Sequence, residues 1–339
     1  MSRIWRHPVL LALTAALTLV LAPASAHAAA PATYGVRPAT ATAPDTRPNF
    51  SYSATPGAII SDFVAVSNLS TDPLTLKLYA NDAYNTPDGG FDLLPGNRAA
   101  TDVGSWTRLE VPEVTVPGRD LRIVPFKLTI PAGATPGDHV GGIVVALVTE
   151  ATDANGQKVA VEQRVGARIY LRVSGDLAPR LAIDELTADY SGSFVGSGET
   201  TIDYTVRNIG NVRLGGRQRV TVETPWGSGT SADNLKDLPE LLPGNSIRQH
   251  VVIPGVLPAG WLDGLVHIEP VAPPGPQPQA QTVEASVTVL AVPWLVLIIL
   301  LLVVALTVFL LWRRRRRKRG ADPTPSQPET EPEVANASA

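Results

Sequence analysis

Residues Ala291 to Trp312 form a run of 22 residues without a charged side chain, and seven cations, Arg313 to Arg319, follow directly. As a helix rising about 1.5 Å per residue, this run extends about 33 Å, enough for the ~30 Å hydrocarbon core of a bilayer. Trp294 and Trp312 lie near its ends, where tryptophan favours the membrane interface. The basic residues predict a cytoplasmic C-terminus, so the chain is predicted to cross the membrane once with its N-terminal part outside.

The two ends of the chain have the composition of processing and tail segments. Residues 1–28 combine Arg3 and Arg6 with the apolar run Val9 to Ala22 and small residues at cleavage spacing, which predicts a signal peptide. An uncleaved membrane anchor is the alternative, but the run is short for a span. Residues 313–339 are predicted to be a basic stop-transfer sequence and a disordered cytoplasmic tail, because almost nothing in them is apolar after the basic run.

Composition excludes several kinds of chemistry. The chain has no cysteine, which rules out disulfides, thiolate metal sites and a cysteine nucleophile. It has only five histidines, which argues against histidine-rich metal sites. Residues 29–291 hold 19 Lys and Arg against 27 Asp and Glu, a net charge of −8, which argues against nucleic acid as a partner. The sequence contains no nucleophile elbow, zinc-protease helix or phosphate loop. We therefore predict neither an enzyme nor a bound cofactor or metal.

The segment between the two ends is predicted to be all β. Leu74 to Ala80, Val124 to Ile130 and Val165 to Val173 alternate apolar and polar residues, with Pro-, Gly- and Asp-rich turns between them. A second set of alternating segments follows Pro179. The fold predicted is two tandem Ig-like antiparallel β-sandwich domains followed by a single transmembrane helix. The boundaries predicted are 29–45 for a flexible N-terminal segment, 46–176 and 180–290 for the sandwiches, and 291–312 for the helix.

An ordered set of short motifs between residues 34 and 175 resembles the peptidoglycan-binding domain of WxL-interacting proteins, in its actinobacterial form. The motifs are Thr55-Pro56-Gly57, Val64-Ala65-Val66-Ser67-Asn68, Asn81-Asp82-Ala83-Tyr84, Gly104-Ser105-Trp106 and Pro136-Gly137-Asp138-His139-Val140-Gly141-Gly142. The resemblance implies a cell-surface protein whose first domain binds peptidoglycan and whose partner is a secreted WxL-type surface protein. The second domain shows only a generic Ig-like pattern.

The segment 164–173 provides the first candidate binding surface. Its alternation places Arg164, Arg168, Tyr170 and Arg172 on the face opposite the apolar residues. Guanidinium groups pair bidentately with carboxylates and phosphates. Successive side chains on one face of a strand lie about 6.6 Å apart. This ladder suits an extended anionic cell-wall polymer. The alternative is a solvated face whose arginines pair with neighbouring acidic residues.

A long loop and a glycine pair provide the other candidates. Aromatic faces stack on sugar rings and carboxylates accept sugar hydroxyls, a combination offered by Tyr84, Asp88, Phe91, Asp92 and Trp106. Trp106 alternatively closes the end of the sandwich, and Asp82, Asn85, Asp88 and Asp92 alternatively surround calcium without matching an EF-hand. His139 lies beside Gly141 and Gly142 and is either a ligand contact or a cap on a strand end.

These features lead to two hypotheses of function. The first is a membrane-anchored bacterial surface protein that binds peptidoglycan or another wall polymer through its first sandwich and scaffolds a surface partner. The second is a passive Ig-like spacer or protein-interaction scaffold without affinity for glycans.

Overall fold

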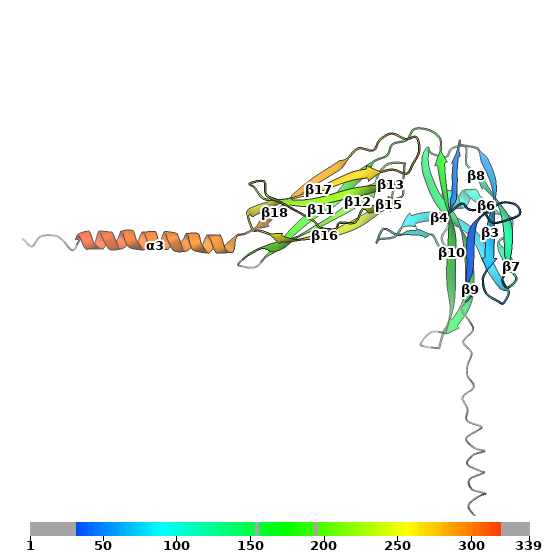
Figure 1. Ribbon diagram of the computed structural model, residues 1–339, viewed down its shortest axis with the longest axis horizontal. Helices are drawn as coiled ribbons and strands as arrows, with labels where there is room; N and C mark the ends of the chain where they lie inside the picture. Colours follow the sequence, from blue (N-terminus) through cyan, green and yellow to red (C-terminus); the bar gives the residue numbers. More distant parts are fainter. Residues whose placement is uncertain (1–31, 153–155, 193–195, 320–339) are drawn as a thin grey trace, which may run out of the picture.

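The computed structural model describes residues 32–152, 156–192 and 196–319. The signal peptide predicted for 1–28 and most of the predicted tail lie outside these residues. Figure 1 shows two bodies of β-strands and one long helix. The strands of the first body run across the long axis of the molecule, whereas those of the second body and the helix run along it. The predicted all-β architecture followed by one apolar helix is confirmed.

The first sandwich consists of a four-stranded and a six-stranded sheet. Their strand orders are β1-β3-β8-β6 and β2-β10-β9-β4-β5, with β7 beside β4. The bounds are β1 (Tyr34–Ala39), β2 (Phe50–Ala54), β3 (Ile59–Asn68), β4 (Leu74–Asn85), β5 (Phe91–Leu93), β6 (Thr107–Leu109), β7 (Glu113–Val116), β8 (Leu121–Thr129), β9 (Gly137–Thr152) and β10 (Lys158–Val173). A one-turn helix, α2 (Val103–Trp106), precedes β6.

Alternating apolar residues of both sheets form the core of this sandwich. Val64, Val66 and Phe126 from one sheet pack with Ile143 and Ile169 from the other. The strand pairs are antiparallel except that β2 runs parallel to β10, which departs from the purely antiparallel prediction. The departure arises because β2 follows β1 across residues 40–49, changes sheet and enters the second sheet at its edge.

The prediction of a flexible segment at 29–45 is wrong for the residues that the structure describes. β1 pairs along its whole length with β3, and Tyr34 and Ala39 are buried. The following residues are held by Arg47, whose guanidinium donates to both oxygens of Asp62 at 2.7 and 3.1 Å. Pairing to β3 supplies the hydrogen bonds and burial that order the segment.

The second sandwich consists of a three-stranded sheet, β11-β12-β16, and a five-stranded sheet, β14-β13-β17-β18 with β15 beside β13. The bounds are β11 (Leu181–Gly192), β12 (Gly198–Asn208), β13 (Leu214–Glu223), β14 (Gly229–Ser231), β15 (Leu238–Leu241), β16 (Ser246–Val256), β17 (Gly260–Val271) and β18 (Val283–Ala291). Tyr204, Ile202, Ile253 and Ile268 are fully buried in its core.

Both sandwiches use a buried asparagine at the end of a strand in the same way. Asn68 ends β3 and Asn208 ends β12, and both are almost completely buried. Each side-chain amide donates to carbonyls of two separate segments, and each side-chain oxygen accepts the backbone N–H two residues later. Because buried carbonyls need partners, these amides fix the strand ends and the turns that follow.

The helix α3 (Trp294–Arg319) is long and apolar enough to cross a membrane. Its apolar side chains are exposed, as expected for a helix surrounded by lipid. The predicted span of 291–312 needs correction at both ends. Ala291 is a buried residue of β18, and the helix begins after Pro293 and continues through the basic run.

Candidate functional site

The outward face of β10 holds the predicted ladder. Ala167, Ile169, Leu171 and Val173 are buried, and Arg168, Tyr170 and Arg172 alternate with them on the other face. Arg164 lies on the same side nearer the hairpin tip. The structure brings these four residues onto one side of the strand, but their surroundings differ.

Arg164 and Arg172, at the two ends of the ladder, bond to other residues of the first sandwich. Arg164 donates to the carbonyl of Leu93 at 3.0 Å and lies 3.6 Å from a carboxylate oxygen of Asp92. Arg172 forms a bidentate pair with Asp138 at 2.7 and 2.8 Å, and this pair raises the pKa of the guanidinium. These two arginines therefore pair with neighbouring acidic residues, as the alternative interpretation of the ladder predicts.

Arg168 has different neighbours. Its guanidinium lies 4.1 Å from the centroid of the Phe91 ring and donates to the hydroxyl of Tyr170 at 3.3 Å. Arg168 is exposed and forms no ion pair within the described residues. The Phe91 and Tyr170 rings lie 6.4 Å apart, so the loop aromatic and the ladder meet in one cluster. We call Phe91, Arg168 and Tyr170 the aromatic–arginine cluster.

The other predicted loop residues divide between two locations. The hydroxyl of Tyr84 donates to Asp92 at 3.1 Å, next to Arg164. Asp88 is exposed in the turn between β4 and β5, where it accepts a hydrogen bond from the hydroxyl of Thr86. In the same turn, Gly89 has a positive φ and lies so close to Ile247 and Pro239 that a Cβ would clash with them. The turn therefore leans against the second sandwich.

The four side chains considered for calcium point to different partners. Asp82 accepts backbone N–H groups of residues 101, 102 and 104, whereas Asn85 bonds to residues 240, 242 and 245 of the second sandwich. Within the described residues, no three His, Cys, Asp or Glu side chains are grouped suitably for a metal. The three acidic residues bond within the first sandwich, and Asn85 joins it to the second.

Trp106 and His139 lie together, and His139 is paired with Leu171, the residue next to Tyr170 in β10. The centroids of the Trp106 and His139 rings are 4.9 Å apart, and Trp106 packs against the core from α2. The His139 Nδ1 lies 2.7 Å from an oxygen of Asp102, and its Nε2 lies 2.8 Å from the carbonyl of Thr135. His139 lines a cavity of about 200 Å³ between the sandwiches, opposite Asn211 and Asn245. His139 therefore caps the start of β9 through its two hydrogen bonds and also lines the cavity at the junction.

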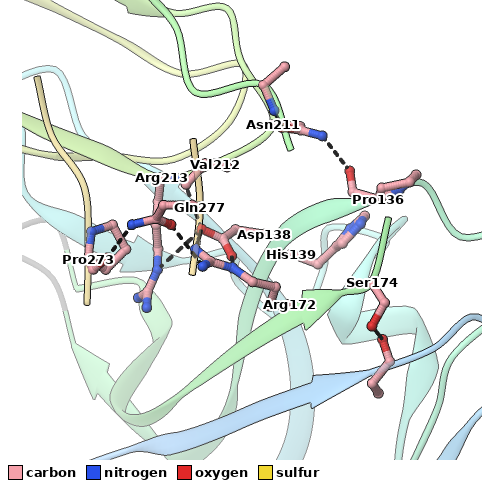
Figure 2. A network of polar contacts seen from close by, with 12 residues as sticks. Pro136, Asp138, His139, Arg172, Ser174, Asn211, Val212, Arg213, Pro273 and Gln277 are labelled. Atoms are coloured by element: carbon pink, nitrogen blue, oxygen red, sulfur yellow. Dashed lines mark hydrogen bonds and ion pairs between the residues drawn. The ribbon is translucent and has the colours of Figure 1, made fainter. Parts of the chain in front are cut away.

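The side chain of Asp138 is the central acceptor of this junction (Figure 2). It is only 4% exposed, accepts both bonds from Arg172 and also accepts the backbone N–H of Arg213 at 3.0 Å. Asn211 adds a bond to the carbonyl of Pro136 at 2.9 Å, and Arg172 reaches Gln277 at 2.8 Å. The two sandwiches are thus joined by charge-assisted and neutral hydrogen bonds.

Sequence reasoning missed Arg213, whose guanidinium lies 3.9 Å from the centroid of the Tyr170 ring. Arg213 also borders a groove of about 510 Å³ with Asn49, Ser51, Tyr170, Glu240 and residues 271–274. No local pattern marks Arg213, because its partners are distant in sequence: Asp138 and Tyr170 of the first sandwich and Glu240 of the second, whose carboxylate lies 3.1 Å away. A polar position before the buried Leu214 is the only signal that the sequence offers.

Protonation of His139 is expected to stabilise the first sandwich where it borders the junction. Burial alone lowers the pKa of His139, but bonds to Asp102 and Thr135 outweigh this and raise it above the ordinary 6.5. Both partners are acceptors, so only the doubly protonated ring satisfies both. The contribution, about 1.5–3 kcal/mol for bonds to a charged group, should be fully present below the unfolded-state pKa and lost as pH rises through the folded-state pKa.

His139→Gln tests this dependence against the wild type by urea unfolding at about pH 5.5 and about pH 9. The variant should be less stable at the lower pH, and the difference should shrink at the higher pH. An equal difference at both values contradicts a charged role for His139.

Comparison with protein-family models gave no match, and comparison with curated proteins gave none. The solved structures with a similar fold include the following three. A chain of the chaperone–tip adhesin complex of CFA/I fimbriae biogenesis is 12% identical, covering 77% of this chain and 99% of that chain, with a TM-score of 0.36. The YadV chaperone is 12% identical, with 76% and 99% covered and a TM-score of 0.31. A chain of the Salmonella enterica SafA pilin–SafB chaperone complex is 9% identical, with 77% and 99% covered and a TM-score of 0.33. At these identities and TM-scores, no function is transferred from them.

Proposed function

We propose that this chain is a bacterial cell-surface protein, anchored by α3, whose first sandwich binds peptidoglycan or another anionic cell-wall polymer. Its N-terminal part lies outside the cell and its C-terminus in the cytoplasm, in keeping with the basic residues at the end of α3. The proposed role is adhesion without bond-making chemistry. The observation that carries the proposal is the aromatic–arginine cluster, with exposed Arg168 between half-buried Phe91 and Tyr170, beside the groove lined by Tyr170 and Arg213.

The cluster has the chemistry that a wall polymer requires. Arg168 is held over Phe91, so its planar group is already oriented to pair with the carboxylate of a stem peptide. One arginine lies over each of the Phe91 and Tyr170 rings, and the remaining half-buried surface of the two rings offers apolar contact for sugars. The groove adds the polar side chains of Asn49, Ser51 and Glu240 for hydroxyl and amide groups.

Co-sedimentation of the full chain in detergent with purified peptidoglycan tests the proposal. Arg168→Ala and the double variant Phe91→Ala/Tyr170→Ala should each weaken binding roughly tenfold, equivalent to about 1.4 kcal/mol. Arg37→Ala is the matched control, because Arg37 is an exposed strand arginine on the opposite sheet. It should bind like the wild type.

Absence of wild-type retention even at low salt would instead support the second candidate, a spacer or protein-interaction scaffold. The hydrogen-bonded junction around Asp138 favours such a role, since it holds the sandwiches in one arrangement. The motif resemblance adds a secreted WxL-type surface protein as the proposed protein partner. Its binding to the same full chain is measured by pull-down in a separate experiment.

A further inference from the structure

The second sandwich exposes four large apolar side chains at the end from which the helix leaves. Trp226, Leu257, Trp261 and Leu290 are 67%, 60%, 55% and 70% exposed, respectively. We call these four residues the apolar rim. Single exposed apolar residues are common on protein surfaces, but several at one end require a reason.

The strand register places the rim at this end. Gly260 pairs with Ala291, the last residue before the link to α3, and Trp261 pairs with Leu290. Leu257 lies in the β16–β17 connection. Trp226 lies in the β13–β14 turn, which follows the pairing of Glu223 with Asp263. Figure 1 shows that α3 continues from this end along the same axis.

The rim lies close to the start of α3 along the chain. Ala291 and Trp294 are three residues apart, at most about 11 Å of chain, and Trp261 is one strand position, about 3.3 Å, farther along. The headgroup region on each side of a bilayer is roughly 5–8 Å thick. Tryptophan prefers this region because its ring is apolar and its N–H stays hydrated.

Charge also divides this end of the sandwich from the rest. Residues 224–232, 251–262 and 285–312 contain no Asp, Glu, Lys, Arg or His, and all three segments meet here. The next layer holds exposed Glu223 and its half-buried strand partner Asp263, two strand positions beyond Trp261, and exposed Glu199, which lies opposite Pro254 at the same end. These carboxylates set a depth limit, because they remain in water.

We propose that the apolar rim inserts into the headgroup interface of the outer leaflet and forms a second membrane contact beside α3. The inference rests on the proposed function only in that α3 must span the bilayer. Lipid contacts made by the β13–β14 turn, the β16–β17 connection and the β17–β18 pair would restrict tilting of the second sandwich about the link at residues 292–293. The hydrogen-bonded junction then transmits this orientation to the first sandwich, which holds the aromatic–arginine cluster at a set height above the membrane surface.

The absence of cysteine allows single spin labels to test this contact in the full chain. Ser228→Cys and Leu257→Cys place labels at the rim while both tryptophans remain. Ile209→Cys is the matched control, since Ile209 is 48% exposed in the connection at the opposite end of the sandwich. Leu302→Cys marks the middle of α3. Each variant is reconstituted in phosphatidylcholine–phosphatidylglycerol vesicles, and accessibility to oxygen and to a water-soluble nickel chelate is measured.

Labels at 228 and 257 should be more accessible to oxygen than to nickel, as at 302, whereas 209 should show the reverse. Adding Trp226→Ser and Trp261→Ser should return label 228 to water. Rim labels that behave like 209, while 302 remains in lipid, overturn the rim contact and leave the span intact. A label at 302 in water overturns the span itself. Rim protection that disappears when protein is diluted with lipid indicates contact between copies of the chain and also overturns the proposal.

Discussion

Arg172→Ala is expected to lower the free energy of unfolding of the first sandwich by about 3 kcal/mol, near the lower end of the range for breaking a buried ion pair. The variant leaves the Asp138 carboxylate, 4% exposed, without its bidentate partner. The cost stays near the lower end because the backbone N–H of Arg213 still donates to Asp138, and its guanidinium lies 3.6 Å away. Urea unfolding of the full chain in detergent, followed by tryptophan fluorescence, measures the loss.

Arg122→Ala is the matched control for this variant. Arg122 pairs with Asp120 at 3.1 Å, but both side chains are 48% exposed, so the cost should not exceed about 1 kcal/mol. Arg172→Lys should fall between the wild type and Arg172→Ala, because an ammonium keeps the charge without the fork. Equal stabilities of Arg172→Ala and Arg122→Ala would show that Asp138 does not depend on Arg172.

The second large effect is expected for Asp82→Asn, which should lower the free energy of unfolding by about 2–4 kcal/mol. The loss arises because backbone N–H donors would face the NH₂ group of the new amide. One carboxylate oxygen accepts the N–H of Gly104 at 2.7 Å, and the other accepts those of Thr101 and Asp102 at 2.6 and 2.9 Å. An asparagine has the same shape but only one acceptor oxygen. At least one buried N–H group would therefore lose its partner.

Because these N–H groups begin the turn α2, the variant should also displace the residues that α2 carries. Trp106 and Asp102 both contact His139, so the emission of Trp106 should shift and hydrogen exchange in 101–106 should accelerate. Asp88→Asn, in an exposed turn, is the control and should change stability by no more than about 0.5 kcal/mol. Unchanged exchange at 101–106 in Asp82→Asn would mean that other contacts hold α2.

The candidate site shows how far local sequence patterns extend. The period of two along β10 correctly predicts a common face for Arg168, Tyr170 and Arg172, because alternation in a strand is fixed by backbone geometry. The pattern does not reveal which arginine is already paired. Asp138 and Asp92 lie far from these arginines in sequence and reach them only through the β9–β10 and β4–β5 pairings.

The flexible segment predicted at 29–45 fails for a related reason. Local composition there favours disorder, yet residues 34–39 gain a complete set of strand contacts from β3. Similarly, the predicted start of the span at Ala291 follows the loss of charge in the sequence. The final strand of the second sandwich and the helix are equally apolar there, so only pairing with β17 shows where one ends and the other begins.

The sequence by itself determined the short strands, the all-β class and the single apolar helix, because these depend on local periodicity and on the absence of charge over 22 residues. Only the tertiary structure decided that Arg172 is part of the junction, that Arg168 is exposed over Phe91 and that Arg213 covers Tyr170. The physical reason is that a side chain's charge and freedom depend on neighbours brought near by strand pairing and by contact between the sandwiches, and neither is encoded within a short stretch of chain.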